Sequence, residues 1–194
     1  LYEGEGNYSK AEELYRDALK RTAGSESIRL DLARLMGLQK RFRDGIVLCE
    51  EVLRDNPSSS GARALLAQLL LGENRVDDAL KELESLKGSG QVGSDAQLKI
   101  GLIKLERRDF EGAETEFRLL LSKHPQHGPS RYYLGLAFSG QGRLDEALAQ
   151  LKTIEQNAPF FRESRILSGY LLRSQKRFDE ALKMIEEAVP QGTV

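Results

Sequence analysis

The chain has 194 residues, a formal net charge of −1, 30% charged residues and 40% hydrophobic residues. That hydrophobic share is enough to build a packed core, which excludes an intrinsically disordered chain. A net charge near zero argues against a nucleic-acid-binding protein and against a polybasic membrane-surface protein. The single cysteine, Cys49, excludes an internal disulfide. No run of about 18 apolar residues predicts a membrane-spanning helix.

One small residue recurs along the chain at a constant interval of 34 residues. Its positions are Ala11, Gly45, Ala79, Ala113, Ala147 and Ala181. An apolar residue stands three positions before each of them, and two more follow at four and seven positions after it. These spacings share one face of an α-helix. Each copy therefore predicts a helix of roughly 13 to 15 residues with one buried stripe.

A first helix precedes this second helix in every copy except the first. The copies are expected at about residues 1–24, 25–58, 59–93, 94–127, 128–161 and 162–194, and the first keeps only the end of its first helix, near Leu1–Gly4. Small residues in the first helices allow close helix approach: Ala33, Ala67, Gly101, Gly135 and Gly169. Short turns force the two helices to be antiparallel. Pro57, Pro125 and Pro159 are expected to stop the second helices.

This 34-residue pattern resembles the tetratricopeptide repeat, in six copies. The resemblance implies an all-α fold, a right-handed superhelical α-solenoid that forms one domain over residues 1–194 and has a concave surface lined by its first helices. One position departs from the family, because Arg29, Arg63, Gln97, Arg131 and Arg165 stand where it usually has a large aromatic residue. Ser168 replaces a core aliphatic residue. Because the chain begins at Leu1 inside an amphipathic pattern, we expect a piece of a longer, bacterial protein.

Few residues suggest chemistry. The letters Gly88-x-Gly90-x-x-Gly93 match a dinucleotide fingerprint, but that motif needs a preceding strand, so a flexible loop and a looser junction are predicted. His124 and His127 lack a third metal ligand, and an exposed turn is expected. Cys49 lies on a helix face and is expected in the core. The sequence thus predicts no catalytic residue, no cofactor and no metal site.

The resemblance places any partner-binding site in the concave groove. The lysine and asparagine clamp of the family members that bind chaperone tails is absent. The candidate groove residues are Leu98, Leu102, Leu105, Tyr132, Tyr133, Leu136, Ile166, Tyr170, Arg34 and Gln68. Aliphatic residues and tyrosines suit an apolar peptide or an amphipathic helix. Some of the aliphatic residues would instead only pack between neighbouring first helices.

The sequence therefore favours a non-catalytic protein-interaction scaffold that binds a protein or peptide partner. Two alternatives stay open. The chain could be a self-association module that forms a homo-oligomer through uncapped ends, or the regulatory region of a larger enzyme or envelope-assembly protein. No nucleic acid and no membrane insertion are expected. One cysteine fits either the cytoplasm or the periplasm, and the cytoplasm is favoured for this soluble chain.

Overall fold

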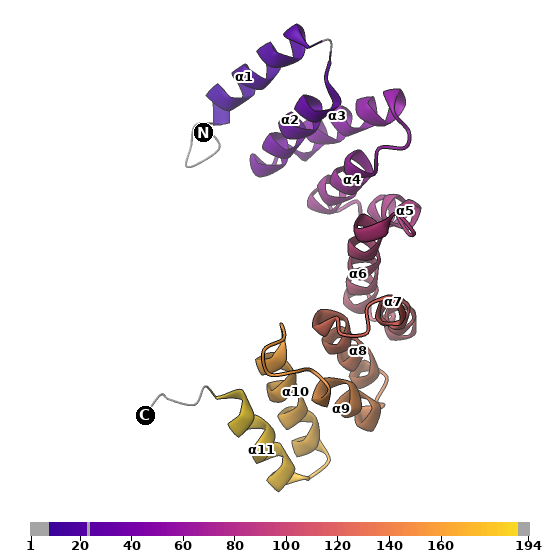
Figure 1. Ribbon diagram of the computed structural model, residues 1–194, viewed down its shortest axis with the longest axis vertical. Helices are drawn as coiled ribbons and strands as arrows, with labels where there is room; N and C mark the ends of the chain where they lie inside the picture. The colour runs from indigo at the N-terminus through magenta and orange to yellow at the C-terminus, as the bar shows by residue number, and fades with distance from the viewer. Residues whose placement is uncertain (1–7, 23, 190–194) are drawn as a thin grey trace. The chain divides into compact units, whose positions relative to one another are not determined.

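The computed structural model describes residues 8–22 and 24–189 of the chain. Every regular element in these two ranges is an α-helix (Figure 1). In chain order the helices are α1 Tyr8–Arg21, α2 Glu26–Leu38, α3 Phe42–Asp55, α4 Ser60–Gly72, α5 Val76–Ser85, α6 Gly90–Glu106, α7 Phe110–Lys123, α8 Gly128–Gly140, α9 Leu144–Lys152, α10 Phe161–Ser174 and α11 Phe178–Ala188. The first-helix remnant expected near Leu1–Gly4 lies outside the described residues.

The predicted helix pairs are confirmed. Short turns join α2 to α3, α8 to α9 and α10 to α11, and the joined helices pack against each other. The small residues that mark the 34-residue pattern point into the core, and Ala79, Ala113 and Ala147 are fully buried. The fold is therefore an all-α solenoid of antiparallel helix pairs.

By its contacts the chain divides into two compact units, Leu1–Ala96 and Gln97–Val194, here called the first and the second unit. In the first unit, α2 packs against α3 and α4, and the core is made of aliphatic side chains and Cys49. In the second unit, α8 packs against α7, α9 and α10, and the core includes the rings of Phe117 and Phe138. The single domain expected over residues 1–194 stays a prediction.

Arginines in the first turns of four first helices tie each helix pair together. We call Arg29, Arg63, Arg131 and Arg165 the first-turn arginines. They donate to Asp55 Oδ2 at 2.7 Å, Glu82 Oε2 at 2.9 Å, Thr153 Oγ1 at 2.8 Å and Glu187 Oε2 at 2.8 Å, respectively. Each also donates to at least one backbone carbonyl close to the start of its own helix or the end of the preceding one. Charge-assisted hydrogen bonds thus replace the aromatic residue that the resemblance leads one to expect.

Each turn inside a helix pair has one residue with a left-handed backbone conformation, always at the same position of the 34-residue repeat. The backbone φ angle is positive at Lys40, Asn74, Arg108, Gly142 and Lys176, which are again 34 residues apart. The next amide along the chain reaches back into the first helix, as Arg41 N does to the Met36 carbonyl at 2.9 Å. This geometry closes a helix C-terminus by satisfying its last carbonyls. The left-handed conformation costs the least free energy for glycine, and Gly142 is the one glycine among these five residues.

The structure corrects the loop expected at Gly88–Gly93. Helix α6 already begins at Gly90, so Gly90 and Gly93 are helical and only the preceding residues form a turn. A Cβ atom on Gly93 would lie 2.7 Å from the Leu86 carbonyl oxygen at the end of α5. The glycine therefore lets α6 start directly against the preceding helix, which a loop prediction from glycine content alone misses.

The structure also corrects the role of Pro159 and the length of some second helices. Pro57 and Pro125 do follow α3 and α7 by two residues, but α9 ends at Lys152, well before Pro159. Arg165 donates to the carbonyls of Leu151 and Ile154 at 3.0 and 3.2 Å, and a continuing helix would need such carbonyls for its own ladder. Helix α9 has 9 residues and α5 has 10, fewer than expected.

Candidate functional site

The candidate surface consists of side chains on the first helices of the second unit. Helix α6 supplies Leu98, Leu102 and Leu105, α8 supplies Tyr132 and Leu136, and α10 supplies Ile166 and Tyr170. We call these seven residues the first-helix row. Within each helix they are three or four positions apart, so they share one face. All but Tyr170 are partly buried, and Tyr170 is 56% exposed.

Three leucines of the row also contribute to the core. Leu98, Leu102 and Leu105 pack against the buried cluster that contains Phe117 and Phe138. They are therefore anchored from below while part of each side chain stays accessible. The sequence left open whether the aliphatic residues pack within the fold. These leucines do so, and this packing fixes their position.

An aromatic cluster forms the middle of the surface. The ring of Tyr132 stacks on Phe160 with centroids 4.9 Å apart, and the ring of Tyr133 meets Tyr132 edge-on at 5.4 Å. Tyr133 also stacks on Phe117 of α7 at 5.8 Å, which turns it toward the core. Tyr133 thus supports Tyr132, and its own contact with a partner stays a prediction.

Phe160 is a residue that the sequence reasoning missed. It lies directly before α10 with a φ angle of 67°, which is left-handed and unfavourable for an aromatic residue. Such a conformation costs about 1–2 kcal/mol. Contacts of its ring with both Tyr132 and Tyr133 offset that cost, since aromatic pairs each contribute about 0.5–1.5 kcal/mol beyond burial. The one sequence signal was an apolar pair after Pro159, in a turn where the 34-residue period assigns no core position.

The electrostatics of the surface are mild. The pKa of the Tyr132 hydroxyl is raised above its usual range, mainly by desolvation and then by Tyr133 and the Glu163 carboxylate. Tyr132 therefore stays protonated at neutral pH and can donate a hydrogen bond. The guanidinium of Arg173 lies 5.4 Å from the ring centroid of Tyr170, a cation–π contact. The row thus offers apolar area with a donor near its middle and a cation at one end.

Two predicted site residues belong to the other unit. Arg34 in α2 and Gln68 in α4 are exposed, and Arg34 pairs with Asp31 on its own helix. Their part in a partner-binding surface stays a prediction, and the surface described here consists of second-unit residues.

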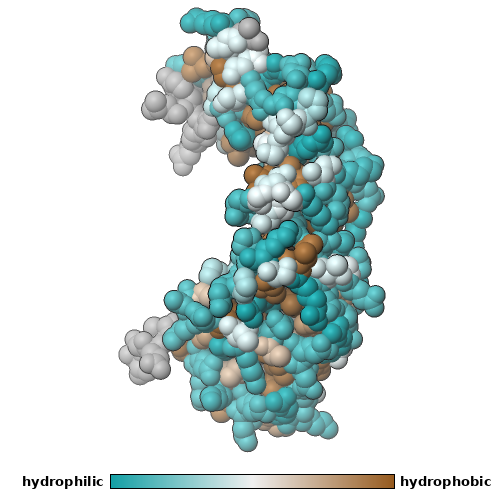
Figure 2. All heavy atoms as spheres, turned by 45° about the vertical axis from the view of Figure 1, so that its right-hand side comes forward, coloured by the Kyte–Doolittle hydropathy of each residue, from teal (hydrophilic) through white to brown (hydrophobic). Residues whose placement is uncertain are grey.

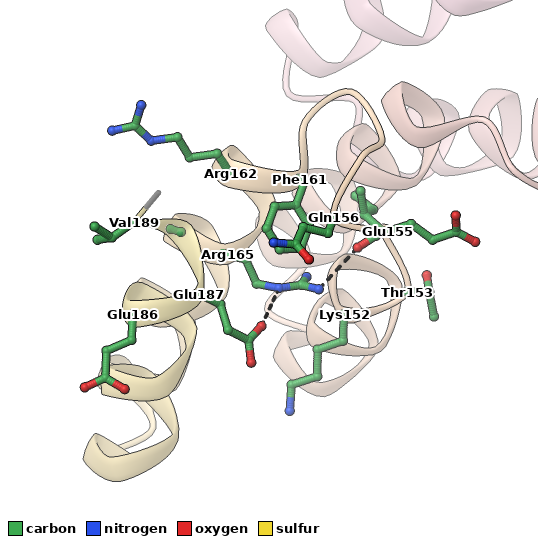
Figure 3. Close-up of a pocket in the computed structure, with 12 residues that line it drawn as sticks. Lys152, Thr153, Glu155, Gln156, Phe161, Arg162, Arg165, Glu186, Glu187 and Val189 are labelled. Atoms are coloured by element: carbon green, nitrogen blue, oxygen red, sulfur yellow. Dashed lines mark hydrogen bonds and ion pairs between the residues drawn. The ribbon is translucent and has the colours of Figure 1, made fainter. Parts of the chain in front are cut away.

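A cleft whose lining includes no residue of this row lies around Arg165 (Figure 3). Its volume is about 810 Å³, and it is bounded by the end of α9, the start of α10 and the end of α11. Arg165 is at its centre and is already bound to Glu187 and to two carbonyls. The guanidinium also lies 4.4 Å from the centroid of the Phe161 ring. The cleft is therefore a mixed-charge surface whose central cation is neutralised.

Other residues that could bind a metal ion or act as a nucleophile have structural roles. The ring of His127 caps α8 by accepting a hydrogen bond from the Ser130 amide at 3.3 Å. Cys49 is fully buried, and burial raises the pKa of its thiol to about 12, so it is no nucleophile. Among the described residues, no three His, Cys, Asp or Glu side chains gather where they could hold a metal ion. In the same residue ranges, no helix is long and apolar enough to cross a membrane.

The arginines of the turns are also neutralised. Arg143 Nη1 lies 2.6 Å from Glu114 of the preceding pair, and Arg143 pairs with Glu146 on its own helix. Arg41 is paired in the same way with Glu12 and Asp44. Arg143 and Arg41 are thus held in local ion pairs, and on the face shown in Figure 2 hydrophilic surface surrounds small separate hydrophobic areas.

Comparisons with known proteins identify the family to which this chain belongs. Family models described as tetratricopeptide repeat match residues 38–99 and, through a second model, residues 98–160 and 132–193. The chain belongs to the tetratricopeptide repeat family, whose members generally act as protein-interaction scaffolds. The resemblance read from the sequence is therefore confirmed.

Individual relatives are distant. Cellulose synthase operon protein C of Pseudomonas fluorescens is 21% identical over 162 residues, which are 79% of this chain and 13% of that protein. The crystal structure of MamA is 17% identical with a TM-score of 0.71, covering 81% of this chain and 92% of MamA. YrrB, described as a TPR protein with an unusual peptide-binding site, is 16% identical with a TM-score of 0.69, covering 91% of both chains. These structures share the fold.

Proposed function

We propose that this chain is a non-catalytic interaction scaffold and that the first-helix row of the second unit binds an apolar peptide or a short partner helix. The observation that carries the proposal is the set of aliphatic and tyrosine side chains that α6, α8 and α10 place in the first-helix row, with Tyr170 largely exposed at one end. The equivalent residues of α2 and α4 in the first unit include Arg34 and Gln68, which are polar. The other equivalent positions there are Leu30 and Gly37 in α2 and Ala64 and Leu71 in α4, so the first unit offers fewer large apolar side chains at these positions than the row does.

The side chains of the row indicate which kind of partner they would bind. Leu102, Leu136 and Ile166 supply aliphatic contact area, which suits an amphipathic helix that inserts apolar side chains three or four positions apart. The Tyr132 hydroxyl can donate to a peptide carbonyl. Arg173, beside Tyr170, favours an acidic residue or a carboxylate at that end of the partner. The rigid tyrosines lose little conformational entropy on binding, which is why such residues dominate binding energies.

Selection from a displayed random-peptide library on the immobilised chain tests the proposal. We expect selected peptides to carry apolar residues at helical spacing. Tyr170→Ala should weaken their binding by more than about tenfold, because exposed aromatic anchors contribute over 1 kcal/mol. Tyr132→Phe, which keeps the ring on Phe160, should weaken binding less.

The matched control is Leu119→Ala. Leu119 is also an exposed large apolar residue of the second unit, but it lies on the second helix α7. Its loss should leave peptide affinity unchanged within about twofold, whereas equal losses in Tyr170→Ala and Leu119→Ala would place the binding surface elsewhere.

A further inference from the structure

The aromatic cluster lies beside an exposed carboxylate. Glu163, Ile166 and Tyr170 are three and four positions apart, so Glu163 shares the face of α10 that carries the first-helix row. The Glu163 carboxylate also contributes to the raised pKa of the Tyr132 hydroxyl, which places this charge close to α8. A negative charge therefore stands where the row meets the rings of Tyr132 and Phe160.

No cation of α10 neutralises this carboxylate. Among the described residues, none forms an ion pair or a hydrogen bond with Glu163. Arg162 precedes it but points about 100° away around the helix, and it lines the cleft around Arg165. Arg165 is itself bound to Glu187, and Arg173 lies at the other end of the helix. The charge of Glu163 is thus available to a partner.

The cations of the neighbouring first helices do not neutralise it either. Arg131, the one charged residue of α8, is held by hydrogen bonds to the preceding turn and to the end of α9. Lys104 of α6 is paired with a buried glutamate. Lys99, also in α6, occupies the position of the 34-residue repeat that Leu167 has in α10, and not the position of Glu163.

The rings beside Glu163 also lack a cation. Other rings of the second unit are covered by arginines of the chain, as at Phe161 and Phe138, where a guanidinium carbon lies 4.4 and 4.3 Å from the ring centroid. In the part of the chain that the structure describes, no arginine or lysine covers Tyr132 or Phe160 in this way, although both residues are partly exposed. A ring pair next to a carboxylate attracts a guanidinium by cation–π contact and by charge together.

Phe160 reaches this place through a connection that differs from the others. The connection between α9 and α10 runs over residues 153–160, whereas those before α4 and α8 cover only residues 56–59 and 124–127. The residues there at the repeat position of Phe160 are Ser58 and Gln126, and neither has a positive φ angle. Joining two helix pairs therefore does not require this strained aromatic residue, and strained residues concentrate at functional sites.

We propose that Tyr132, Phe160 and Glu163 form a subsite for an arginine side chain of the peptide that binds the first-helix row, an inference that rests on the function proposed above. The guanidinium stacks on the ring pair and forms an ion pair with Glu163. Arg173 lies about 15 Å further along α10, where it favours an acidic residue of the same peptide. The subsite thereby fixes the direction in which the peptide binds.

Peptides selected by display on the unaltered chain provide the probe, and we expect them to contain an arginine beside their apolar residues. Synthetic copies with citrulline in place of that arginine keep nearly the same shape but lose the charge. This change should weaken binding about sixfold on the unaltered chain and only about twofold on Glu163→Gln, because the ion pair is then already absent. Isothermal titration calorimetry measures the four affinities.

Two further variants test the assignment to these residues. Glu186→Gln makes the same substitution at an exposed carboxylate of α11 and should leave the preference for arginine over citrulline unchanged. Phe160→Gly fits the left-handed φ angle without a Cβ clash, so the turn should persist while the preference falls to about threefold.

The outcomes separate this subsite from the function proposed above. Peptides that depend on Tyr170 but tolerate citrulline would overturn the subsite alone, and so would an arginine preference that stays at its full size in Glu163→Gln. Failure to select any peptide on the unaltered chain would overturn both proposals.

Discussion

The two units use one repeat in two different ways. In the first unit, the small first-helix residue Ala33 lies in a core cluster of Cys49 and small or aliphatic side chains. In the second unit, the same phase holds glycine, and Gly101 lies so close to Phe117 that a Cβ atom would be 2.6 Å from its ring. A smaller residue on one helix is therefore matched by a larger residue on its neighbour, as close packing requires, and the 34-residue period does not change.

The surface shows a larger difference than the core. At one equivalent position α2 and α4 have Arg34 and Gln68, while α6, α8 and α10 have Leu102, Leu136 and Tyr170. The proposed function rests on this apolar surface of the second unit. The four predictions below test whether the two units differ as described.

The largest effect is expected at a buried ion pair of the second unit. Lys104 Nζ lies 2.8 Å from Glu116 Oε1, and the Glu116 side chain is almost completely buried. Lys104→Met should lower the free energy of unfolding by about 3–5 kcal/mol, because it removes this cation from a buried carboxylate. Urea unfolding measures this effect, and Lys104→Met combined with Glu116→Leu should recover most of the loss.

The matched pair in the first unit should matter far less. Arg63 and Glu82 occupy the phases of Gln97 and Glu116, but their ion pair is partly exposed. Glu82→Gln should cost no more than about 1 kcal/mol. Equal losses at the two pairs would remove this distinction between the units.

Close packing at Gly101 gives the next effect. Alanine normally stabilises a helix relative to glycine by about 1 kcal/mol, yet Gly101→Ala should destabilise the second unit by about 1–3 kcal/mol, since Phe117 is fully buried and cannot yield. Thermal unfolding measures the change. Combining Gly101→Ala with Phe117→Leu should make room for the added methyl group, and a stabilising Gly101→Ala would show that the contact is loose.

A smaller effect of opposite sign is expected in the turns. Lys40 and Lys176 have φ angles of 60° and 62°, one in each unit. Lys40→Gly and Lys176→Gly should each stabilise the chain by roughly 1 kcal/mol, because glycine adopts this conformation without a Cβ clash. Gly142→Ala, at the same phase, is the reverse control and should destabilise the chain in the same melting experiment.

The smallest effect concerns Cys49. A maleimide should not label the folded first unit at pH 8, because burial holds the thiol neutral with a pKa of about 12, and labelling should begin only in denaturant. The folded pKa lies above the ordinary value of 9.0, so the neutral thiol favours the folded state below about pH 9 and this contribution is lost as the pH rises toward 12. Rapid labelling in buffer would show that the first unit opens locally.

The sequence by itself determined the helix pairs, their buried faces and the family. A constant 34-residue interval sets which side chains must be buried, so the burial of Ala79 and Cys49 could be predicted. The apolar positions of the first-helix row could be predicted too, because helical spacing places them on one face.

Only the tertiary structure decided which groups meet. Periodicity identifies a buried face but not its partner, and so it predicts neither the stacking of Phe160 on Tyr132 nor the bonds of Arg165 to two carbonyls. The start of α6 at Gly90 depended on a close approach to Leu86 that glycine content does not reveal. Likewise, Ile185 occupies the same phase as the buried Leu151, and its exposure follows from which described helices pack against α11, a fact that local sequence does not encode.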